Sequence, residues 1–420
     1  MSSYNPLERT IARFLGRFPI VKQLAKATYS RLVYFKSKKN YKIQAITTPV
    51  SFTSHGDNSF FGYYDKSPEN SKGWVIACTT ANATSALPSL NQRVNLIVFD
   101  ADGEVLLSQM INAYNWQQAC RAHWLTDDLI IYNDFDSQKQ NYVSHVLSIG
   151  QVAIVKSFEY PVQDSFKLDY FLSLNYQRLM TLRPDYGYRN LPNLNATELN
   201  NLEHDGLWKV DYATGNAKLL ISLATAYQYQ PKPDFAHGLH KLNHVMISPD
   251  GKQFIFMHRC LVNGRRFDRL FLADATSGDL KLLADHGMVS HCFWADNNTI
   301  LGYMRGPGEK DAYWLLDITT GEFTQFGAGK LERYGDGHPH VYGDWFITDT
   351  YPNKARMQHL ILCNWKTGEV KELGEFFHGF EYVGESRCDL HPRFAPDGKA
   401  VFFDSVFSGK RQLYRMELNQ

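Results

Sequence analysis

A short turn recurs along the chain and limits what the chain can fold into. It reads Asp-x-x-Thr/Ser-Gly at residues 211–215, 274–278 and 317–321, and Asn-Trp-Lys-Thr-Gly at 364–368. The glycine permits a positive φ angle, and the Asp or Asn side chain can bond back to the turn backbone. The last three of these turns are about 45 residues apart, which is the period of propeller blades of four strands each.

A second repeat marks the turn between the first two strands of each blade. Pro-Asp-Gly-Lys followed by an apolar strand occurs after Ser248 and after Ala395. Weaker copies begin at Ser67, Trp124, Trp294 and Val341, and the segment from Asn175 supplies a seventh. The chain is therefore predicted to be all-β, with a seven-bladed β-propeller over residues 41–420. The ring is expected to close by pairing of Tyr41–Thr48 with Gln412–Leu418; a six-bladed ring and a β-solenoid are the alternatives.

The first 40 residues form a different unit. Residues 1–42 contain ten Lys or Arg and one acidic residue, and apolar residues recur there at steps of three and four. This pattern predicts a basic amphipathic helical extension over residues 1–40. Two interpretations stay open: residues 6–36 lie on an anionic membrane, or the helix packs on the flank of the propeller.

Charge and cysteine usage bear on location and partners. The net charge of the whole chain is +1, which gives no electrostatic reason to expect nucleic acid as a partner. The six cysteines have no CxxC spacing, which favours free thiols in a reducing compartment. The protein is therefore expected in the cytoplasm, with peripheral attachment to the inner face of the membrane if the helix binds lipid.

Histidines gather just before the predicted first turns of the blades. In a propeller this position lies at the mouth of the central channel, and eight of the 15 histidines occur there. Imidazoles that converge on one channel can bind a divalent metal ion, and His338 and His340 would share one face of an extended segment. The alternative is that these histidines hydrogen-bond a polar ligand or transfer protons without a metal.

Other polar residues are predicted at the same mouth. Tyr188 and Arg189, side by side, can act as a proton-transfer group and a carboxylate clamp, and Arg259 is a further candidate for binding anions. The chain has no GxSxG, P-loop, GxGxxG or HExxH motif, which disfavours serine hydrolase, NTPase and dinucleotide chemistry.

In its C-terminal half the chain resembles the propeller-fold polysaccharide lyases, above all the oligogalacturonate lyase family and more distantly the ulvan lyases. The resemblance rests on HxxNHVMISPDGKQFIFMHR ending at Arg259, SHCFW at 290–294, GHPH at 337–340 and CDLHPRFAPDGKAVFFDS at 388–405. These families cleave acidic polysaccharides by β-elimination, so the resemblance implies a lyase that acts on an acidic oligosaccharide or polysaccharide containing uronate.

Carried over to this chain, the resemblance implies three groups of residues. A divalent ion (Mn, Zn or Ca), or the substrate carboxylate, would be held by His291, His338, His340 and His391. The acid and base candidates are His123, Tyr188 and His244. Acidic sugar would be bound by Arg121, Arg189 and Arg259, and the further substrate-binding candidates at the mouth are Tyr64 and His240.

Two other functions remain alternatives at this stage. The chain could be a glycosyltransferase or a glycoside hydrolase-like protein of bacterial cell-surface polysaccharide metabolism, which the N-terminal helix would also suit. It could instead be a non-catalytic propeller that binds a glycan or a protein.

Overall fold

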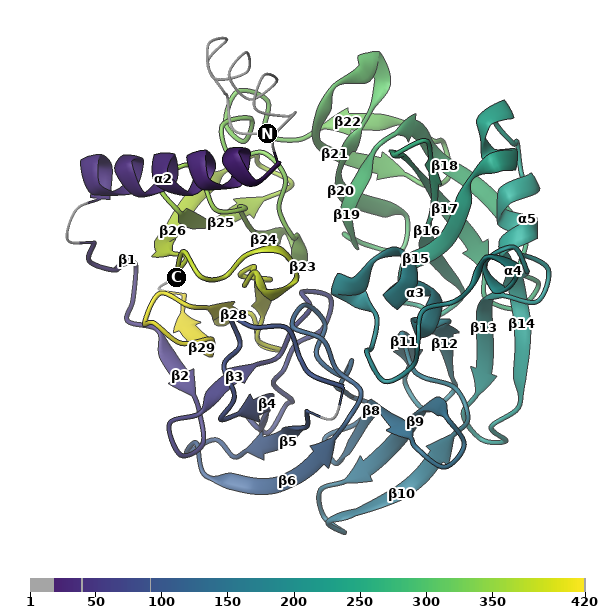
Figure 1. Cartoon of the computed structure of the whole chain (residues 1–420), viewed down its shortest axis with the longest axis horizontal. Coiled ribbons are helices and arrows are strands. Elements are labelled where there is room, and N and C mark those ends of the chain that lie inside the picture. The colour runs from purple at the N-terminus through teal and green to yellow at the C-terminus, as the bar shows by residue number, and fades with distance from the viewer. Residues whose placement is uncertain (1–18, 39–40, 91, 419–420) are drawn as a thin grey trace.

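The described residues form a ring of seven antiparallel sheets. The computed structural model describes residues 19–38, 41–90 and 92–418. Their strands make up seven sheets, of which six have four strands and one has five. The sheets stand around a common centre in chain order, so the predicted seven-bladed β-propeller is confirmed (Figure 1).

Blades 1 to 4 are built from consecutive strands. Blade 1 comprises β3 (Asn58–Phe60), β4 (Val75–Thr80), β5 (Val94–Phe99) and β6 (Val105–Ile111). Blade 2 comprises β7 (His123–Trp124), β8 (Leu129–Asp136), β9 (Asn141–Ser148) and β10 (Ala153–Phe158). Blade 3 comprises β11 (Asp164–Phe166), β12 (Tyr170–Leu174), β13 (Gly206–Asp211) and β14 (Ala217–Ser222). Blade 4 comprises β15 (Leu239–Ile247), β16 (Gln253–Val262), β17 (Arg265–Asp274) and β18 (Leu280–Gly287).

The last three blades complete the ring. Blade 5 comprises β19 (Val289–Trp294), β20 (Thr299–Arg305), β21 (Asp311–Asp317) and β22 (Phe323–Gln325). Blade 6 comprises β23 (His340–Tyr342), β24 (Trp345–Asp349), β25 (Met357–Asn364) and β26 (Val370–Phe377), with β1 (Gln44–Ala45) added at its edge. Blade 7 comprises β27 (Arg393–Phe394), β28 (Ala400–Ser405) and β29 (Gln412–Glu417), with β2 (Val50–Phe52) as its fourth strand.

The N-terminal part of the chain closes the ring, but with other residues than predicted. Strand β2 pairs antiparallel with β29, with Val50 opposite Arg415. The predicted strand Tyr41–Thr48 was wrong, because its residues Gln44–Ala45 pair instead with β26 of blade 6. Pro49 lies between the two strands and has no backbone N–H to donate, which is consistent with a ladder that begins only at Val50.

Six of the seven predicted first turns lie between the first two strands of a blade, and the one from Asn175 does not. Asn175 instead begins helix α3 (Tyr176–Leu182), since its side chain accepts the backbone N–H of Arg178 at 3.0 Å. Such N-cap bonds favour a helix over a strand. The first turn of blade 3 falls at 167–169, where Lys167 has a φ of 51°.

Most of the remaining short helices come just before β13 or just after β14 in the chain. They are η2 (Pro184–Tyr186), α4 (Ala196–Leu199), α5 (Leu223–Gln228) and η3 (Pro233–His237), with η4 (Pro307–Glu309) and η5 (Gly384–Ser386) in later loops. Figure 1 shows α3 next to the centre of the ring, on the side facing the viewer. Buried apolar residues fill the spaces between neighbouring sheets.

Helix α2 (Pro19–Lys38) lies on the outside of blade 6 (Figure 1). The Tyr34 ring packs 4.9 Å from that of Phe377, and Lys38 Nζ lies 2.5 Å from Glu375 Oε2. The opposite side exposes apolar side chains, with Leu24 and Leu32 64% and 63% accessible. The described part of the predicted helix therefore packs on the flank and still leaves an apolar face uncovered; residues 6–18 lie outside the described residues. No helix among the described residues is long and apolar enough to cross a membrane.

Candidate functional site

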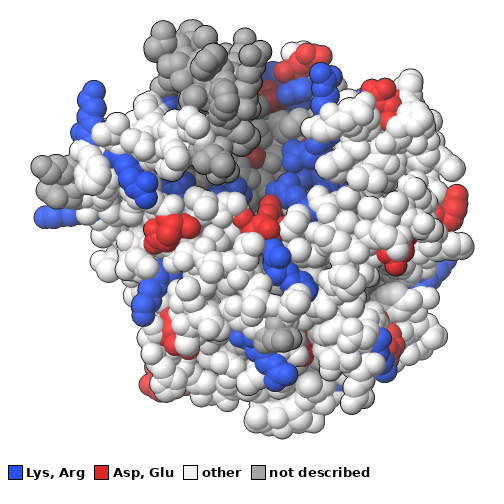
Figure 2. Space-filling model, in the orientation of Figure 1, with Lys and Arg blue, Asp and Glu red and all other residues white. Residues whose placement is uncertain are grey.

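Four histidines from four blades meet at the centre of the ring. The ring of His291 lies 5.5 Å from that of His244 and 4.0 Å from that of His338, which lies 4.3 Å from that of His391. All four side chains are buried. Figure 2 shows a hollow near the centre of this face, with Lys and Arg side chains along its walls. We call these four histidines, together with Asp389, the central cluster.

All four of these histidines are held through Nδ1, and the partner of His244 is the hydroxyl of Tyr63. His338 Nδ1 lies 2.8 Å from Asp349 Oδ1, and His391 Nδ1 lies 2.9 Å from the carbonyl oxygen of Gly62. His291 Nδ1 lies 3.1 Å from Ser290 Oγ. Histidines that bind metals are usually oriented in this way by a partner on the second nitrogen, which leaves the first nitrogen free for the metal.

The central cluster contains a set of donor atoms that fits a divalent ion. One ligand atom each of His338, Asp389 and His391 lie within 4.8 Å of one another. His391 Nε2 is buried and has no hydrogen-bond partner among the described residues. Buried polar atoms seldom remain unpaired. Two imidazole nitrogens and a carboxylate oxygen are a donor set that suits manganese or zinc.

Arg387 keeps the carboxylate of Asp389 charged. Its Nε and one terminal nitrogen each lie 2.7 Å from one oxygen of Asp389. Burial disfavours a charged carboxylate, but the charge and hydrogen bonds of Arg387 outweigh it and lower the pKa of Asp389. The carboxylate is therefore ionised at neutral pH.

Three tyrosines line the cluster, two of them beside His244 and one beside His338. The hydroxyl of Tyr63 hydrogen-bonds to His244 Nδ1, and the Tyr186 ring lies 5.4 Å from that of His244. The Tyr64 ring lies 5.5 Å from that of His338. Burial raises the pKa of Tyr63 and Tyr64 well above 10 and lowers that of His244 well below 6.5. At neutral pH, protonated phenols therefore stand next to a neutral imidazole.

Cationic side chains surround the same point. The guanidinium of Arg183 lies 4.8 Å from the centre of the Tyr186 ring, and that of Arg387 lies 4.6 Å from the centre of the Tyr351 ring. Arg259 is buried and lies 3.4 Å from Asp268. Lys241 is also buried, but burial, together with Arg259 and Arg183, lowers its pKa to about 6, so this amine is mainly uncharged at neutral pH and the positive charge comes from the three arginines. Such a concentration of cationic groups favours an anionic ligand.

The backbone is strained at two residues of the cluster. His244 and His391 have φ angles of 51° and 43°, in the left-handed region that non-glycine residues seldom adopt. Each such residue costs of the order of 1–3 kcal/mol and persists only where the surrounding structure enforces it. Strain of this kind is common at functional sites.

The structure brings six of the predicted site residues together. His244, His291, His338 and His391 form the cluster, Tyr64 packs against it, and Arg259 is one of the charges that lower the pKa of His244 and His291. The metal-binding, catalytic and substrate-binding roles of these residues stay predictions.

Two of the predicted residues are packed in the interior instead. Tyr188 is fully buried between blades 2 and 3, where its ring stacks on that of Tyr176 at 4.4 Å. His340 packs against Phe293, 4.6 Å away between ring centres. It does not share a face with His338 because strand β23 begins only at His340.

Two further predicted residues have their polar groups occupied near the channel. Arg121 makes two hydrogen bonds to Asp65, at 2.9 and 2.7 Å. His123 contacts Ser165 Oγ at 2.6 Å and the carbonyl oxygen of Arg121 at 2.8 Å. Burial, together with Lys66 and Arg121, lowers the pKa of His123 to about 3.

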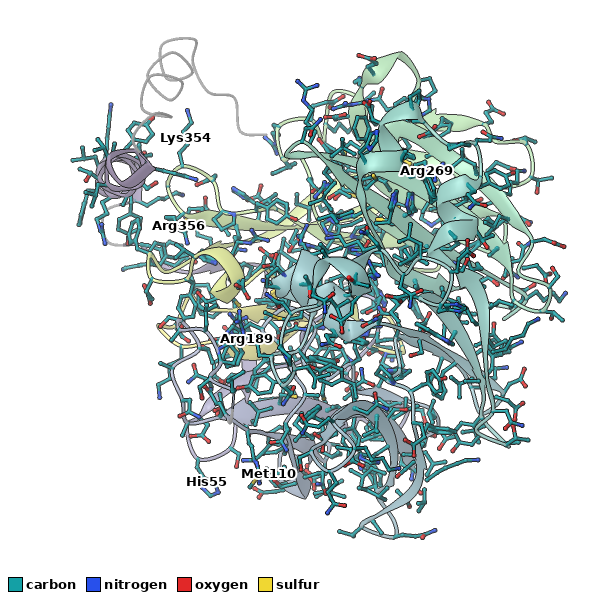
Figure 3. All side chains as sticks on the ribbon, turned by 45° about the vertical axis from the view of Figure 1, so that its right-hand side comes forward. His55, Met110, Arg189, Arg269, Lys354 and Arg356 are labelled. Carbon is teal, nitrogen blue, oxygen red and sulfur yellow. The ribbon has the colours of Figure 1, made fainter. Side chains whose placement is uncertain are left out.

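The last two predicted residues lie apart from the cluster. Arg189 pairs with Glu385 in a loop contact. His240 lies inside blade 4, where its Nδ1 is 2.9 Å from His258 Nε2, close to the labelled Arg269 (Figure 3).

The sequence contained a signal for two acidic residues that were not predicted. Asp389 and Asp336 each stand two residues before a cluster histidine, in the repeated pattern Asp-x-His. Asp336 Oδ2 accepts the hydroxyl of Ser290 at 2.5 Å, and its Oδ1 lies 3.3 Å from His291 Nδ1. Lys241 and Arg387 were also missed, because single cations in a sequence do not reveal that they are buried.

No protein-family model matches the chain, and no curated protein matches its sequence. Among solved structures, an oligogalacturonate lyase from Vibrio parahaemolyticus superposes with a TM-score of 0.59 and 13% identity, covering 90% of this chain and 97% of that one. The fold resembles that of oligogalacturonate lyases. A second oligogalacturonate lyase, in complex with manganese, has a TM-score of 0.56 and 14% identity over 90% of this chain and 98% of that one. One structure from a study of two prolyl endopeptidases has a TM-score of 0.50 and 10% identity, covering 98% of this chain and 54% of that one.

Proposed function

We propose that the chain is a metal-dependent lyase that cleaves an acidic, uronate-containing glycan by β-elimination at the central cluster. The observation that carries this proposal is the convergence, on one buried point, of histidines from four blades with a carboxylate, a Tyr–His pair and several cations. The manganese in a structural neighbour and the neighbours' lyase activity support it as analogy.

The residues would divide the work of the elimination among them. His338, His391 and Asp389 would hold a divalent ion, which when bound neutralises the uronate carboxylate and acidifies the proton on C5. Burial lowers the pKa of His244 and His291, and the nearby charges of Arg259 and Arg183 lower it further. These two arginines would help to bind the substrate carboxylate.

His244 and Tyr63 would transfer the protons. His244 is neutral and accepts the proton from C5 as the C4–O bond breaks and the C4=C5 double bond forms. Tyr63, which is protonated, donates its proton to the leaving oxygen. Their mutual hydrogen bond then returns the proton from His244 to Tyr63, which restores both groups.

An absorbance assay tests this function directly. The protein, loaded with manganese, is incubated with oligogalacturonate and a panel of other acidic glycans, and the ultraviolet absorbance of the new C4=C5 bond is followed. We expect activity in the wild type and in the control His286→Ala, whose exposed side chain lies outside the cluster. The variant His338→Ala/His391→Ala should lose both activity and bound manganese; no absorbance with any glycan, or an unchanged double variant, would refute the proposal.

We also propose that α2 attaches the protein to the inner, cytoplasmic face of an anionic membrane. The helix contains five Lys or Arg and no acidic residue, and its free side exposes Leu24, Leu32 and Phe35 by more than half. An apolar stripe flanked by cations is the pattern of helices that lie in the membrane interface.

Vesicle sedimentation tests this attachment. The full chain should sediment with vesicles that contain phosphatidylglycerol and stay in solution with vesicles of phosphatidylcholine alone. Leu24→Asp/Leu32→Asp should lose binding to the anionic vesicles without a change in melting temperature, since both side chains point into solvent. Equal binding by this variant and the wild type would contradict the proposal.

A further inference from the structure

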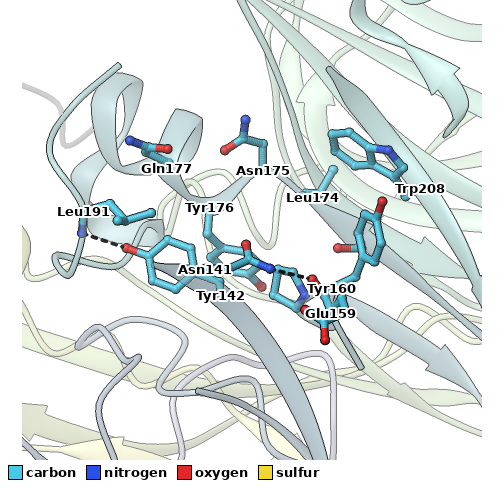
Figure 4. A pocket seen from close by; sticks show the side chains of 12 residues that line it. Asn141, Tyr142, Glu159, Tyr160, Leu174, Asn175, Tyr176, Gln177, Leu191 and Trp208 are labelled. Carbon is cyan, nitrogen blue, oxygen red and sulfur yellow. Dashed lines mark hydrogen bonds between the residues drawn. The ribbon is translucent and has the colours of Figure 1, made fainter. Parts of the chain in front are cut away.

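A cavity lies between blades 2 and 3, apart from the central cluster (Figure 4). Its volume is about 380 Å³, within the range of ~300–1,000 Å³ that is usual for small-ligand sites. One wall comes from blade 2 and the loop after β10, and the other from blade 3 and α3. It is lined by Asn141, Tyr142, Glu159, Tyr160, Pro161, Ser173, Leu174, Asn175, Tyr176, Gln177, Leu191 and Trp208. We call this cavity the blade 2–3 pocket.

Aromatic rings form much of its surface. Trp208 and Tyr160 are both partly exposed, and their ring centres lie 6.1 Å apart with the planes inclined by 44°. Tyr142 and Tyr176 are buried beneath them. Flat rings of this kind offer an apolar surface for the C–H face of a pyranose ring, and the Trp208 indole N–H can donate a hydrogen bond.

Two side-chain amides of the pocket are fixed by hydrogen bonds to backbone carbonyls. The side-chain nitrogen of Asn141 donates to the Glu159 carbonyl at 2.8 Å, and that of Gln177 donates to the Pro192 carbonyl at 2.8 Å. The amide oxygens of Asn141 and Gln177 are thereby left as acceptors for hydroxyl groups. The side chain of Glu159 is exposed and adds a carboxylate.

One buried hydroxyl in the pocket lacks a partner. Ser173 is 0% exposed, and its Oγ has no hydrogen-bond partner among the described residues. Leaving such a group unpaired costs free energy, which a ligand hydroxyl that reached it would recover. This hydroxyl is an independent sign that the pocket receives a polar molecule.

The charge of the pocket selects against acidic sugars. Among the residues that line it there is no Lys or Arg, and the single charged group is Glu159. Lys139 contacts Glu159 only at the exposed rim, where both side chains are more than half accessible. A uronate carboxylate would therefore meet acceptors and a negative charge, whereas a neutral sugar would meet partners for its hydroxyl groups.

We propose that the blade 2–3 pocket binds a neutral sugar unit of a glycan, as a site separate from the central cluster. A row of contacts separates the two: Tyr176 donates to Gln163 Oε1 at 2.8 Å, and the Gln163 carbonyl accepts Arg121 Nε at 3.1 Å. The pocket would hold a neutral part of a polymer whether or not the cluster cleaves an acidic part, so it does not depend on the proposed activity.

Fluorescence titration with neutral and acidic tetrasaccharides tests the proposal. The probes are cellotetraose, maltotetraose, mannotetraose and tetragalacturonate. At least one neutral probe should change the tryptophan fluorescence of the wild type in a saturable way. Trp208→Ala should raise its Kd about tenfold, because one stacking ring is lost. Trp345→Ala, a partly buried tryptophan in blade 6, should leave that Kd unchanged.

A second variant tests the pocket even if Trp208→Ala does not fold. Glu159→Ala changes an exposed side chain, so it should keep the wild-type melting temperature and still weaken binding of the neutral probe about threefold. Tetragalacturonate binding should be unaffected by Trp208→Ala and lost in His338→Ala/His391→Ala, which separates this site from the central one. The inference is overturned if no neutral probe saturates, if both pocket variants bind like the wild type, or if Trp208→Ala weakens tetragalacturonate instead.

Discussion

The central cluster and the blade 2–3 pocket are both lined with tyrosine, but they differ in charge and in the kind of buried polar atom that has no partner. The cluster is surrounded by Arg183, Arg259 and Arg387, and its unpaired buried atom is a ring nitrogen, His391 Nε2. The pocket has one exposed carboxylate and a buried hydroxyl with no partner. The difference suggests one region built for charge and chemistry, and another built for hydroxyl groups and stacking.

The largest expected difference between the two regions is in the ion pairs beside them. Arg121→Met would leave the buried Asp65 carboxylate without its partner, and should lower the free energy of unfolding by about 3–5 kcal/mol. Lys139→Met removes the exposed pair at the rim of the pocket and should cost less than about 1 kcal/mol. Urea unfolding of both variants measures this; similar losses would show that the two ion pairs do not differ in this way.

The next largest effect is expected on manganese affinity, from the carboxylate of Asp349, which holds two of the cluster histidines. Asp349 accepts the ring N–H of His338 at 2.8 Å and the backbone N–H of His391 at 3.1 Å. Asp349→Asn should weaken manganese binding about 10–100-fold, because the orientation of the ligands is lost. Calorimetric titration with manganese checks this, with Asp317→Asn in an exposed turn as the control. An unchanged Kd in Asp349→Asn would remove Asp349 from the proposed metal site.

The free energy of unfolding should depend on pH because of Lys241, a buried lysine near the cluster. The pKa of Lys241 is lowered to about 6, whereas an unfolded lysine titrates near ~10.4. Between these values the unfolded chain binds one proton more than the folded chain, so Lys241 makes the free energy of unfolding rise with pH.

Lys241→Met should remove this contribution, which amounts to at most about 1.4 kcal/mol per pH unit. Urea unfolding at several pH values between about 6.5 and about 8.5 measures the slope for both proteins. Lys252→Met, at a side chain that is 80% exposed, is the control. Parallel slopes for wild type and Lys241→Met would mean that Lys241 is charged in the folded protein.

The smallest effect is expected inside the blade 2–3 pocket. Ser173→Ala removes a hydroxyl that has no partner and should not destabilise the protein; a gain of up to about 1 kcal/mol is expected. Ser144→Ala, close by, removes a hydroxyl that donates to the Tyr160 carbonyl at 2.8 Å and should cost about 1 kcal/mol. Thermal unfolding of the two variants compares them, and an equal loss in both would show that the Ser173 hydroxyl is bonded.

The sequence predicted the ring of blades but not the strand pairing that closes it. The turns with Gly215, Gly278, Gly321 and Gly368 all have positive φ angles and join the third and fourth strands, because a local turn is determined by nearby residues. The pairing of Val50–Phe52 with β29 depends on contacts across more than 350 residues, which no local pattern specifies. The turn predicted from Asn175 was wrong because helix N-caps and turns use the same residue types, and Asn175 is an N-cap.

The predicted site divides in a similar way. Four histidines next to the blade entrances reached the centre, two of them with positive φ (His244 and His391) and two without it (His291 and His338). His340 and Tyr188 carry equally suitable side chains, yet they fill the spaces between blades. Only the packing of neighbouring sheets decides between these outcomes, and the sequence pattern does not contain it.

The pairing of β2 with β29 also has a consequence for biosynthesis. Blade 7 joins residues 50–52 to residues 412–417, so the ring cannot close until nearly the whole chain has left the ribosome. Tyr63 follows the start of blade 1 and His391 precedes blade 7, and their rings lie 5.1 Å apart across this junction. A nascent chain, or a C-terminally shortened one that lacks the strands of blade 7, therefore cannot close the ring, and no closed ring then holds its cluster histidines around one centre.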